Sequence, residues 1–315
     1  MDTRIYSLES RDFTEMECAL SAWDHQYRQI SPGPFHGSLL HTQTGSTGIF
    51  RNRWERAIHY QGVAPEGALA VAISIAQTGE ARWMGQPVGL NDLIVQRCGA
   101  EAEYRSASLW DSMVFAIAEV ELVQKIADIT HDDPCDFIIH GVVHLTPQVA
   151  AQVRQACLVY LDTAAHHLKN LDTASSLPQM MEAITKVIAY ALVSSKPQHN
   201  TKQSFIRQRQ LIKKVEDYCA CHTRQPLRIN LICREIGVSE RTLRDAFHKM
   251  ANTSPLAYLK IEQLNRVRRK LHDTAPDEML IKQVAFTNGF SHLGQFSRDY
   301  KQLFGELPSE TLRRH

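Results

Sequence analysis

ICREIGVSERTLRDAF, residues 232–247, and VAFTNGFSHLGQFSRDY, residues 284–300, are two copies of one pattern. Each copy has a short apolar helix, a glycine, one apolar residue, a serine and a second amphipathic helix, and the glycines Gly237 and Gly289 lie 52 residues apart. A glycine permits the positive φ of a tight turn, and a serine can cap the helix that follows it. This is the pattern of a helix-turn-helix, so the sequence predicts two such motifs.

The second helix of each copy separates into an inner and an outer face. Leu243 and Phe247 stand four residues apart, so they lie on one face and are expected to be buried; Phe296 and Tyr300 repeat this spacing. A helix-turn-helix presents the N-terminal part of this helix to base edges in the major groove. The outward residues expected to contact bases are Arg241, Thr242, Arg244, Asp245, Leu293, Ser297 and Arg298. Those expected to contact phosphate groups are Ser239, Lys249, Arg268, Ser291 and Lys301.

The charge of the chain is divided along its length. The 315 residues include 35 Lys and Arg against 34 Asp and Glu. From Thr201 onward there are 21 basic and 12 acidic residues, a net charge of +9, which leaves −8 for the residues before it. Such asymmetry suggests that the C-terminal part meets a polyanion, although a solvated basic face or two mutually attracting domains would give the same count. Two helix-turn-helix copies in register favour DNA.

Residues 255–272, between the copies, are predicted to form one helix. Pro255 suits a first turn, and Ser254 or Thr253 stands where a cap belongs. Eighteen residues at 1.5 Å each span about 27 Å. A rod of this length could hold two recognition helices roughly one turn of DNA apart, so that both enter successive major grooves.

The region 211–314 resembles the DNA-binding domain of the AraC/XylS family of bacterial transcription regulators. The matching strings are EIGVS at 235–239, SPLAY at 254–258, VA at 284–285, NGF at 288–290, QFSRDYK at 295–301 and FGELP at 304–308. The resemblance implies two recognition helices that flank a rigid linker helix, a homodimer, promoter DNA and RNA polymerase as partners, and activation of transcription. Two departures stand out. Gln263 replaces a usual arginine of the linker helix, and Leu293 with Gly294 replaces more polar residues, so the first copy is expected to supply more of the specificity.

The N-terminal part is predicted to be β-rich. Short segments rich in Ile, Val, Leu and Phe, separated by turn residues, predict strands at 38–51, 67–76, 91–97 and 112–118. Strands at this spacing indicate a small barrel or sandwich. The period becomes helical from Thr146, with a second helix at 177–192, and an earlier helix is expected at 14–29. AWDHQY at 22–27 and SPGPFHG at 31–37 look similar to the N-terminal segment of ethanolamine-operon regulators.

The expected fold class is α+β, with an N-terminal β-rich, barrel-like sensor domain that carries a helical hairpin and a C-terminal all-α double helix-turn-helix domain. The expected domains are a sensor and dimerisation domain at 1–193, a polar linker at 194–204 and the DNA-binding domain at 205–315. Seven cysteines without a Cys-x-x-Cys pair, and no apolar run near 18–20 residues, indicate a reduced cytoplasmic protein with no membrane partner.

A candidate ligand pocket in the sensor domain is formed by Phe35, His36, Trp54 and Trp83, and Trp23 and Trp110 are further candidates for its lining. Its aromatic residues would suit a partly apolar metabolite, or an amine held by cation–π contact. The alternative is a DNA-binding protein with no small-molecule ligand, controlled by its abundance or by a protein partner. A more remote alternative is a barrel-type metalloenzyme. No His-x-His pair is present, so no enzyme activity, metal or cofactor is expected.

Overall fold

The computed structural model describes residues 3–20, 23–45, 47–170, 176–195, 203–223, 225, 227–273 and 281–314. Contacts divide the chain into two compact units. The N-terminal unit contains residues 1–27 and 36–200, and the C-terminal unit contains residues 28–35 and 201–315. The expected linker at 194–204 falls largely on 196–202, which lie outside the described residues. The grouping of residues 28–35 with the C-terminal unit was not anticipated by the predicted domain bounds.

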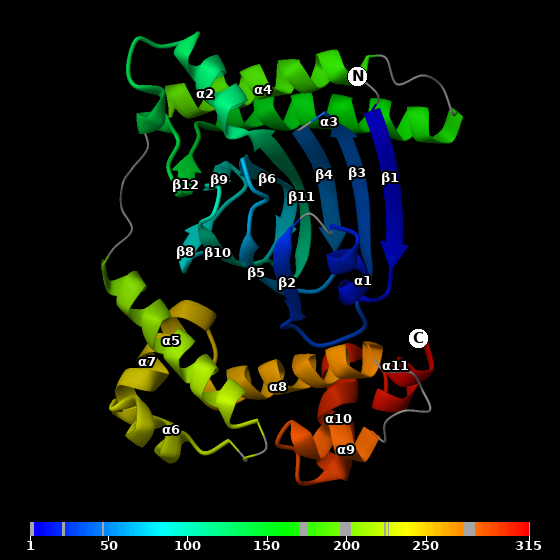
Figure 1. The fold of residues 1–315 in the computed structure, drawn as a ribbon, viewed down its shortest axis with the longest axis vertical. Helices are drawn as coiled ribbons and strands as arrows, with labels where there is room; N and C mark the ends of the chain where they lie inside the picture. The colour runs from blue at the N-terminus through cyan, green and yellow to red at the C-terminus, as the bar shows by residue number, and fades with distance from the viewer. Residues whose placement is uncertain are drawn as a thin grey trace. The chain divides into compact units, whose positions relative to one another are not determined.

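The N-terminal unit contains two antiparallel sheets (Figure 1). The seven-stranded sheet has the order β1 (Thr3–Ser10), β3 (Gly37–Thr44), β4 (Thr47–Trp54), β11 (Leu109–Ala118), β6 (Ala68–Thr78), β9 (Asp92–Gln96) and β12 (Gly141–His144). The five-stranded sheet has the order β2 (Asp24–Gln29), β5 (Ile58–Val63), β10 (Glu101–Arg105), β7 (Ala81–Trp83) and β8 (Gln86–Val88). A short helix, α1 (Phe13–Cys18), follows β1. Among the described strands the two sheets do not close into one barrel.

Alternation along the strands gives the seven-stranded sheet two apolar faces. In β11, Met113 and Phe115 belong to a large core that includes residues of the helices, whereas Trp110 and Val114 face a cavity lined by both sheets. The same switch occurs in β6, where Val71 packs in the helical core and the neighbouring alanines line the cavity. The sheet is therefore buried on both sides, which explains why its strands have near-continuous apolar sequences.

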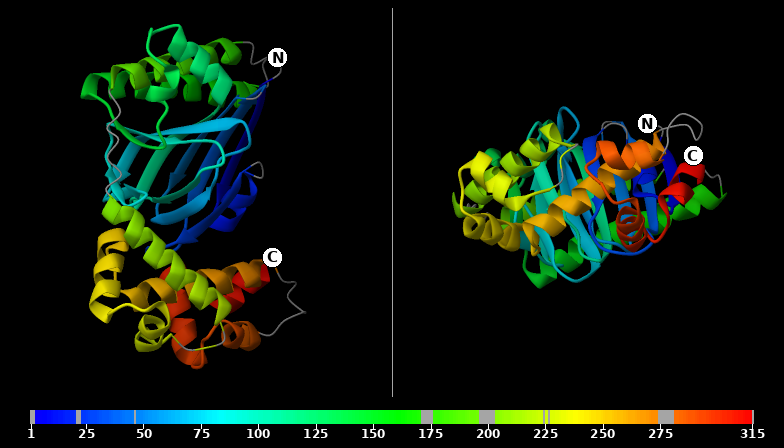
Figure 2. Two further views of the ribbon diagram at one scale, coloured as in Figure 1. Left: turned by 60° about the vertical axis from the view of Figure 1, so that its left-hand side comes forward. Right: turned by 90° about the horizontal axis from the view of Figure 1, so that it is seen from below.

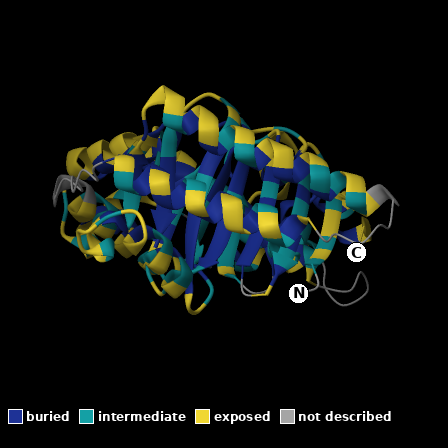
Figure 3. Cartoon of the chain, turned by 90° about the horizontal axis from the view of Figure 1, so that it is seen from above, coloured by how far each residue is buried: buried dark blue, intermediate teal, exposed yellow. Residues whose placement is uncertain are grey.

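Three helices complete the core on the outer side of this sheet: α2 (Glu119–Ala127), α3 (Pro147–Asn170) and α4 (Leu177–Ser194). Helices α3 and α4 run side by side, as both Figure 1 and Figure 2 show. Their inward residues are buried and their outward residues exposed (Figure 3). The buried Tyr160 hydroxyl of α3 lies 2.6 Å from the Thr42 hydroxyl of β3, and burial raises the pKa of Tyr160 to about 12. The expected helical hairpin is thus present.

Two predicted elements of this unit are wrong. The helix expected at 14–29 ends at Cys18, and Asp24–Gln29 form a strand instead. Strand β2 pairs in the second sheet next to β5, about thirty residues further along the chain, and this distant pairing overrides the local helical pattern. The single strand expected at 38–51 is a hairpin of β3 and β4, with a left-handed Gly45 at φ +58° after the first strand.

The C-terminal unit is helical apart from residues 28–35. Its described helices are α5 (Gln203–Cys221), α6 (Ile229–Ile236), α7 (Glu240–Ala251), α8 (Pro255–His272), α9 (Ile281–Thr287), α10 (Leu293–Phe304) and α11 (Pro308–Arg314). The linker helix α8 has the predicted bounds, and Ser254 caps it by accepting a hydrogen bond from the Ala257 amide at 3.3 Å. Helix α8 packs against α7 at one end and against α9 and α11 at the other, so it connects two lobes.

Candidate nucleic-acid interface

The first lobe contains a helix-turn-helix made by α6 and α7. Gly237 ends α6 in the left-handed conformation at φ +76°, as the sequence predicts, and its amide donates to the Cys233 carbonyl at 2.9 Å. Ser239 then begins α7, because its hydroxyl accepts a hydrogen bond from the Thr242 amide at 3.0 Å. The glycine turns the chain and the serine satisfies an exposed amide, which fixes where the recognition helix starts.

The inner face of α7 holds this helix in place. Leu243 and Phe247 are fully buried, as predicted. The Phe247 ring meets the Tyr258 ring of α8 at 5.1 Å between centroids, with the planes at 69°. Ile212 and Val215 of α5 belong to the same core. Helix α7 is therefore fixed between α5 and α8, and its opposite face is available to a partner.

The predicted base-contacting residues of α7 lie on its exposed side. Arg241, Thr242, Arg244 and Asp245 are all exposed. Arg244 pairs with Glu240 at 3.3 Å, but 70% of the Arg244 side chain is accessible. An exposed ion pair of this kind contributes only about 0.3–0.5 kcal/mol to stability. The Arg244 guanidinium can therefore leave Glu240 and bind another acceptor at little energetic cost.

The second lobe repeats the turn with a different helix start. Gly289 has φ +87°, as predicted, and Phe290 packs on Phe296 at 4.9 Å between ring centroids. Phe296 and Tyr300 are buried, also as predicted. Helix α10 begins after His292, which provides no side-chain cap. The second recognition helix therefore starts without the serine cap that begins α7.

Gln263 of the linker helix packs against the second turn. It is buried, and a Cβ atom added to Gly289 would lie 2.8 Å from the Gln263 side-chain nitrogen. The space beside the turn is thus filled by this amide, in the position where the resemblance led us to expect arginine.

The outward residues of α10 present less hydrogen-bonding capacity than those of α7. Leu293 is 38% exposed, and a Cβ on Gly294 would meet nothing within 4 Å. Arg298 is exposed and Ser297 is half-buried. The Arg298 Nε donates to the Gly294 carbonyl at 3.3 Å. Of the three exposed residues that begin α10, Gln295 is the polar one, and its side-chain nitrogen donates to Asp299 at 2.9 Å. Arg298 supplies the positive charge of this face.

The residues predicted to contact phosphate fall into two groups. Ser239, Lys249, Ser291 and Lys301 are exposed. Arg268 is not, and the expectation that it faces outward is wrong. Only 3% of its side chain is accessible; the guanidinium pairs with Glu306 at 2.8 Å and lies 4.8 Å from the centre of the Phe304 ring. The sequence contains the signal for this burial, since Leu264, Arg268 and Leu271 are spaced along one face of α8.

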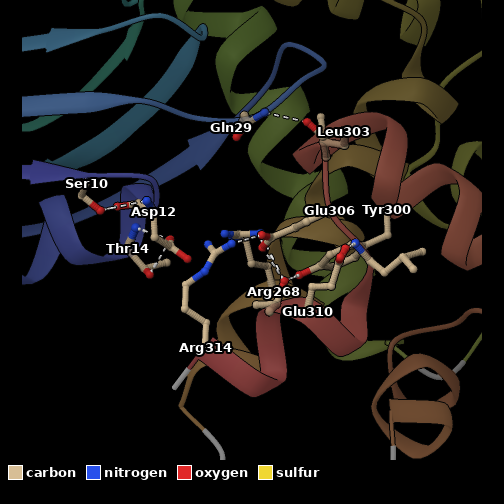
Figure 4. A network of polar contacts seen from close by, with 12 residues as sticks. Ser10, Asp12, Thr14, Gln29, Arg268, Tyr300, Leu303, Glu306, Glu310 and Arg314 are labelled. Atoms are coloured by element: carbon tan, nitrogen blue, oxygen red, sulfur yellow. Dashed lines mark hydrogen bonds and ion pairs between the residues drawn. The ribbon is translucent and has the colours of Figure 1, made fainter.

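Glu306 gathers the polar groups at the junction of α8, α10 and α11 (Figure 4). Besides Arg268, it pairs with Arg314 and accepts a hydrogen bond from the Thr311 hydroxyl at 2.7 Å. The Tyr300 hydroxyl lies 2.8 Å from that of Thr311. This buried network joins the second recognition helix to the linker helix, so Arg268 stabilises the domain from inside.

The N-terminal unit encloses a cavity of about 60 Å³ between its two sheets. Trp54 and Trp83, predicted as pocket residues, both line it, whereas Phe35 and His36 do not. Phe35 is buried and groups with the C-terminal unit. His36 lines a separate polar depression, 3.9 Å from Glu55. Trp23 and Trp110, the further candidates, also line the cavity. The aromatic side chains that the prediction missed are Tyr27, Phe50, Tyr60 and Tyr104. All four lie in strands, whose side chains alternate between the two faces of a sheet, and that alternation was the available signal.

The cavity wall has no Arg, Lys, Asp or Glu, and besides phenols and indoles its polar side chains are those of His25, Asn52 and Gln96. Burial raises the pKa of Tyr27 and of Tyr104 above the usual tyrosine range, so both phenols are neutral. The indole N–H groups of Trp83 and Trp110 have no hydrogen-bond acceptor within the part of the chain that is described. The cavity therefore offers aromatic surface and unused donors, but no fixed charge.

Metal and membrane chemistry find no support among the described residues. In these ranges no group of three or more His, Cys, Asp or Glu is placed to hold a metal ion. None of the described helices is long and apolar enough to cross a membrane.

The sequence relatives of this chain are regulators of operons. A family model described as a helix-turn-helix domain matches residues 232–314. The XylDLEGF operon transcriptional activator of Pseudomonas putida is 22% identical over 293 residues, which cover 92% of this chain and 88% of the activator. The probable thc operon regulatory protein of Rhodococcus erythropolis is 36% identical over 103 residues. That match covers 33% of this chain and 31% of the Rhodococcus protein.

Two solved structures are also similar. A probable AraC family transcriptional regulator from Rhodopseudomonas palustris is 34% identical and covers 33% of this chain and 96% of its own, with a TM-score of 0.30. ToxT from Vibrio cholerae is 10% identical and covers 99% of this chain and 98% of its own, with a TM-score of 0.32. The family assignment depends on the sequence matches.

A basic helical unit with two helix-turn-helix motifs, in a chain whose relatives are operon regulators over nearly its whole length, defines a DNA-binding transcription regulator. These matches bear out the predicted resemblance to regulators of the AraC/XylS family. The sequence relatives reported above are named as regulators and not as enzymes.

Proposed function

We propose that the protein binds promoter DNA as a homodimer, with α7 and α10 in successive major grooves, and activates transcription together with RNA polymerase. The observation that carries this proposal is the arrangement of two exposed recognition helices in lobes at opposite ends of α8. The 18 residues of α8 span about 27 Å, near the length of one DNA turn. Activation, rather than repression, is proposed because the P. putida relatives are named transcriptional activators.

The two recognition helices are proposed to contribute unequally to the sequence preference for DNA. Arg241 and Arg244 can each make a bidentate contact to guanine, which is worth roughly 1–3 kcal/mol of discrimination against another base. Leu293 can pack on a thymine methyl group, and the open surface at Gly294 lets the α10 backbone approach the DNA closely. Helix α7 would then set most of the sequence preference, and α10 a smaller part.

Selection from random duplex DNA tests this function. The purified full-length protein is incubated with random duplexes at a defined salt concentration, and the bound molecules are amplified and sequenced. We expect enrichment of two short boxes about 10 base pairs apart, the whole site being doubled if a dimer binds. Binding without enrichment of any sequence would contradict the proposal.

The cavity is proposed to bind an uncharged effector with a hydrogen-bond acceptor. An ion would lose its hydration in a wall that has no opposite charge, which is costly, whereas an acceptor would satisfy the indole N–H groups of Trp83 and Trp110. A volume of about 60 Å³ limits the molecule to a few non-hydrogen atoms unless side chains move.

Acetamide, acetate and acetamidinium have the same shape and different charges, so they test this proposal directly. We expect acetamide alone to raise the melting temperature, since a ligand of the folded state stabilises it. Ala70→Val, whose added methyl groups enter the cavity, should abolish that rise. A rise with acetate or acetamidinium would overturn the uncharged class, and no rise with any of the three would favour the alternative without a small-molecule ligand.

Helix α3 is the proposed dimer contact. Leu158 and Val159 are adjacent on its outer side, 39% and 48% exposed, and their apolar surface would be buried in a dimer. In sedimentation velocity we expect Val159→Glu to shift the protein towards monomer. Val120→Glu, on the 82% exposed Val120 of α2, is the matched control and should leave the dimer intact. A dimer that survives Val159→Glu would place the contact elsewhere.

A further inference from the structure

Residues 28–35 lie between β2 and β3 in the sequence, yet they group with the C-terminal unit. Two of these residues are buried, Gln29 at 1% and Phe35 at 3% exposed, whereas Pro32 and Pro34 are exposed. We call residues 28–35 the strap. Eight residues from the N-terminal part of the chain are thus packed as part of the DNA-binding unit.

The strap is bound to the linker helix α8 by its backbone. The Gln29 amide donates to the Asn265 Oδ1 at 2.9 Å, and the Asn265 Nδ2 donates to the Gln29 carbonyl at 2.9 Å. The Asn265 side chain therefore satisfies both backbone groups of one residue, as a neighbouring strand would. An ion pair between Arg28 and Glu262 at 3.1 Å lies beside it. Asn265 is itself 1% exposed, so its amide is committed to this contact.

The strap also completes the C-terminal end of the second recognition helix. The last carbonyls of a helix have no partner within the helix. In α10, the Leu303 carbonyl accepts from the Gln29 side-chain nitrogen at 2.6 Å (Figure 4). It also accepts from the Gly33 amide at 3.0 Å. The strap therefore contacts both helices that determine how the second lobe is oriented.

Gly305 allows this close approach. It ends α10 at φ +77°, and a Cβ on it would lie 2.7 Å from the Pro34 nitrogen and 2.8 Å from the Pro34 Cδ. Any side chain at this position would push the strap away. By contrast, Gly237 ends α6 at φ +76°, and its Cβ would meet nothing within 4 Å. Of these two glycines, Gly305 is the one that lies against the strap.

We propose that the strap positions α10 for DNA: residues 28–35 hold the C-terminal end of α10 against α8 and so fix the angle at which the second recognition helix meets its groove. The DNA-binding domain of this protein is then built from two pieces of chain, 28–35 and 201–315. Gln29, Asn265 and Gly305 are positioning residues in this arrangement, since they act through α10. This inference rests on the proposed binding of DNA by α7 and α10.

The two glycines supply a matched pair of variants in the full-length protein. Gly305→Ala and Gly237→Ala impose the same strain on a left-handed residue, but only Gly305→Ala drives a methyl group into the strap. Hydrogen exchange of the peptide that contains residues 28–35, measured without DNA, should accelerate roughly tenfold or more in Gly305→Ala, because buried amides lose their acceptors. Exchange of this peptide should stay unchanged in Gly237→Ala.

DNA binding supplies the second readout. For the wild type, changing the bases of either box in the selected site should weaken binding. In Gly305→Ala, base changes in the box contacted by α10 should reduce the DNA affinity at least about tenfold less than they do in the wild type. Base changes in the α7 box should reduce the affinity of the variant as much as that of the wild type. Asn265→Leu, which removes both bonds to Gln29 and keeps a similar volume, should reproduce this pattern.

The outcomes separate the two proposals. The proposed role of the strap is overturned if hydrogen exchange of residues 28–35 is unchanged in Gly305→Ala, or if this variant loses the same base discrimination at both boxes. If Asn265→Leu does not fold, the comparison of Gly305→Ala with Gly237→Ala still tests the proposal. If the wild type discriminates neither box, the proposed function fails, and the exchange of residues 28–35 still shows whether the strap is bound as described.

Discussion

Arg268 and Lys301 are both basic residues of the C-terminal unit, and the structure assigns them opposite roles. Arg268 has 3% of its side chain accessible and pairs with Glu306. Lys301 is exposed on α10, the proposed second recognition helix. We expect Arg268→Met to destabilise the protein without changing the salt dependence of DNA binding. Lys301→Ala should do the reverse.

The size of each effect follows from the contacts. Removing one partner of a buried ion pair costs about 3–5 kcal/mol. Arg314 and Thr311 still contact Glu306, so the carboxylate left behind retains partners and we expect the lower part of that range, about 3 kcal/mol. Each lost phosphate contact reduces the slope of log K against log salt by about 0.9, which is about 3.5-fold in affinity between 50 and 200 mM salt.

Two assays measure these effects in the full-length protein: urea unfolding, and fluorescence anisotropy of a selected duplex at several salt concentrations. Arg268→Met should lower the unfolding midpoint, and Arg268→Met with Glu306→Met should recover most of it, because the unpaired charge is removed. Lys301→Ala should keep the midpoint and flatten the salt slope. A flatter slope with an unchanged midpoint in Arg268→Met would refute the internal role, and would mean that this arginine leaves Glu306 to contact phosphate.

Three further predictions follow from the same geometry. Arg244→Ala should relax base preference at one position of the α7 box, by roughly 1–3 kcal/mol, whereas an unchanged ranking of site variants in competition binding would exclude base contact by Arg244. Ser239→Ala removes the cap of α7 and should lower the free energy of unfolding by about 1 kcal/mol. Ser291→Ala is its control, because α10 begins at His292 without a side-chain cap, and it should lower stability by less than about 0.5 kcal/mol. Equal melting temperatures of the two variants would contradict this difference. Because burial raises the pKa of Tyr160 to about 12, the unfolded chain loses this proton first as pH rises, so stability should fall between about pH 10, the usual tyrosine value, and pH 12; Tyr160→Phe should be less sensitive to alkali in this range, and an identical pH dependence would contradict the burial of this hydroxyl.

The C-terminal unit was largely predictable because its signals are local. A glycine at 237, a serine at 239 and apolar residues four apart determine a turn, a cap and a buried face within sixteen residues. The structure gives α8 the predicted bounds, and α7 and α10 are the second helices of the two predicted copies. Arg268 is the exception on α8: charge suggested an outward side chain, and its partner Glu306 lies 38 residues away in the sequence.

The N-terminal unit was less predictable because its determinants are distant in sequence. Asp24–Gln29 has helical local spacing, but it becomes a strand by joining the second sheet. The strap needs Asn265, 236 residues beyond Gln29, to satisfy its backbone. Phe35 was expected in the ligand pocket on the strength of its aromatic ring alone, and its neighbours in the fold assign it to another unit. Trp54 and Trp83 were proposed on the same ground, and they line the cavity because β4 and β7 direct their side chains between the sheets.

The central claim is that α7 and α10 enter two successive major grooves. Methylation of guanine at N7 blocks the major groove alone, so methylation interference on the selected duplex tests it most directly. We predict two clusters of interfering guanines about 10 base pairs apart, with the cluster opposite α7 weakened in Arg244→Ala. A single cluster, or binding that N7 methylation does not impair, would contradict the account.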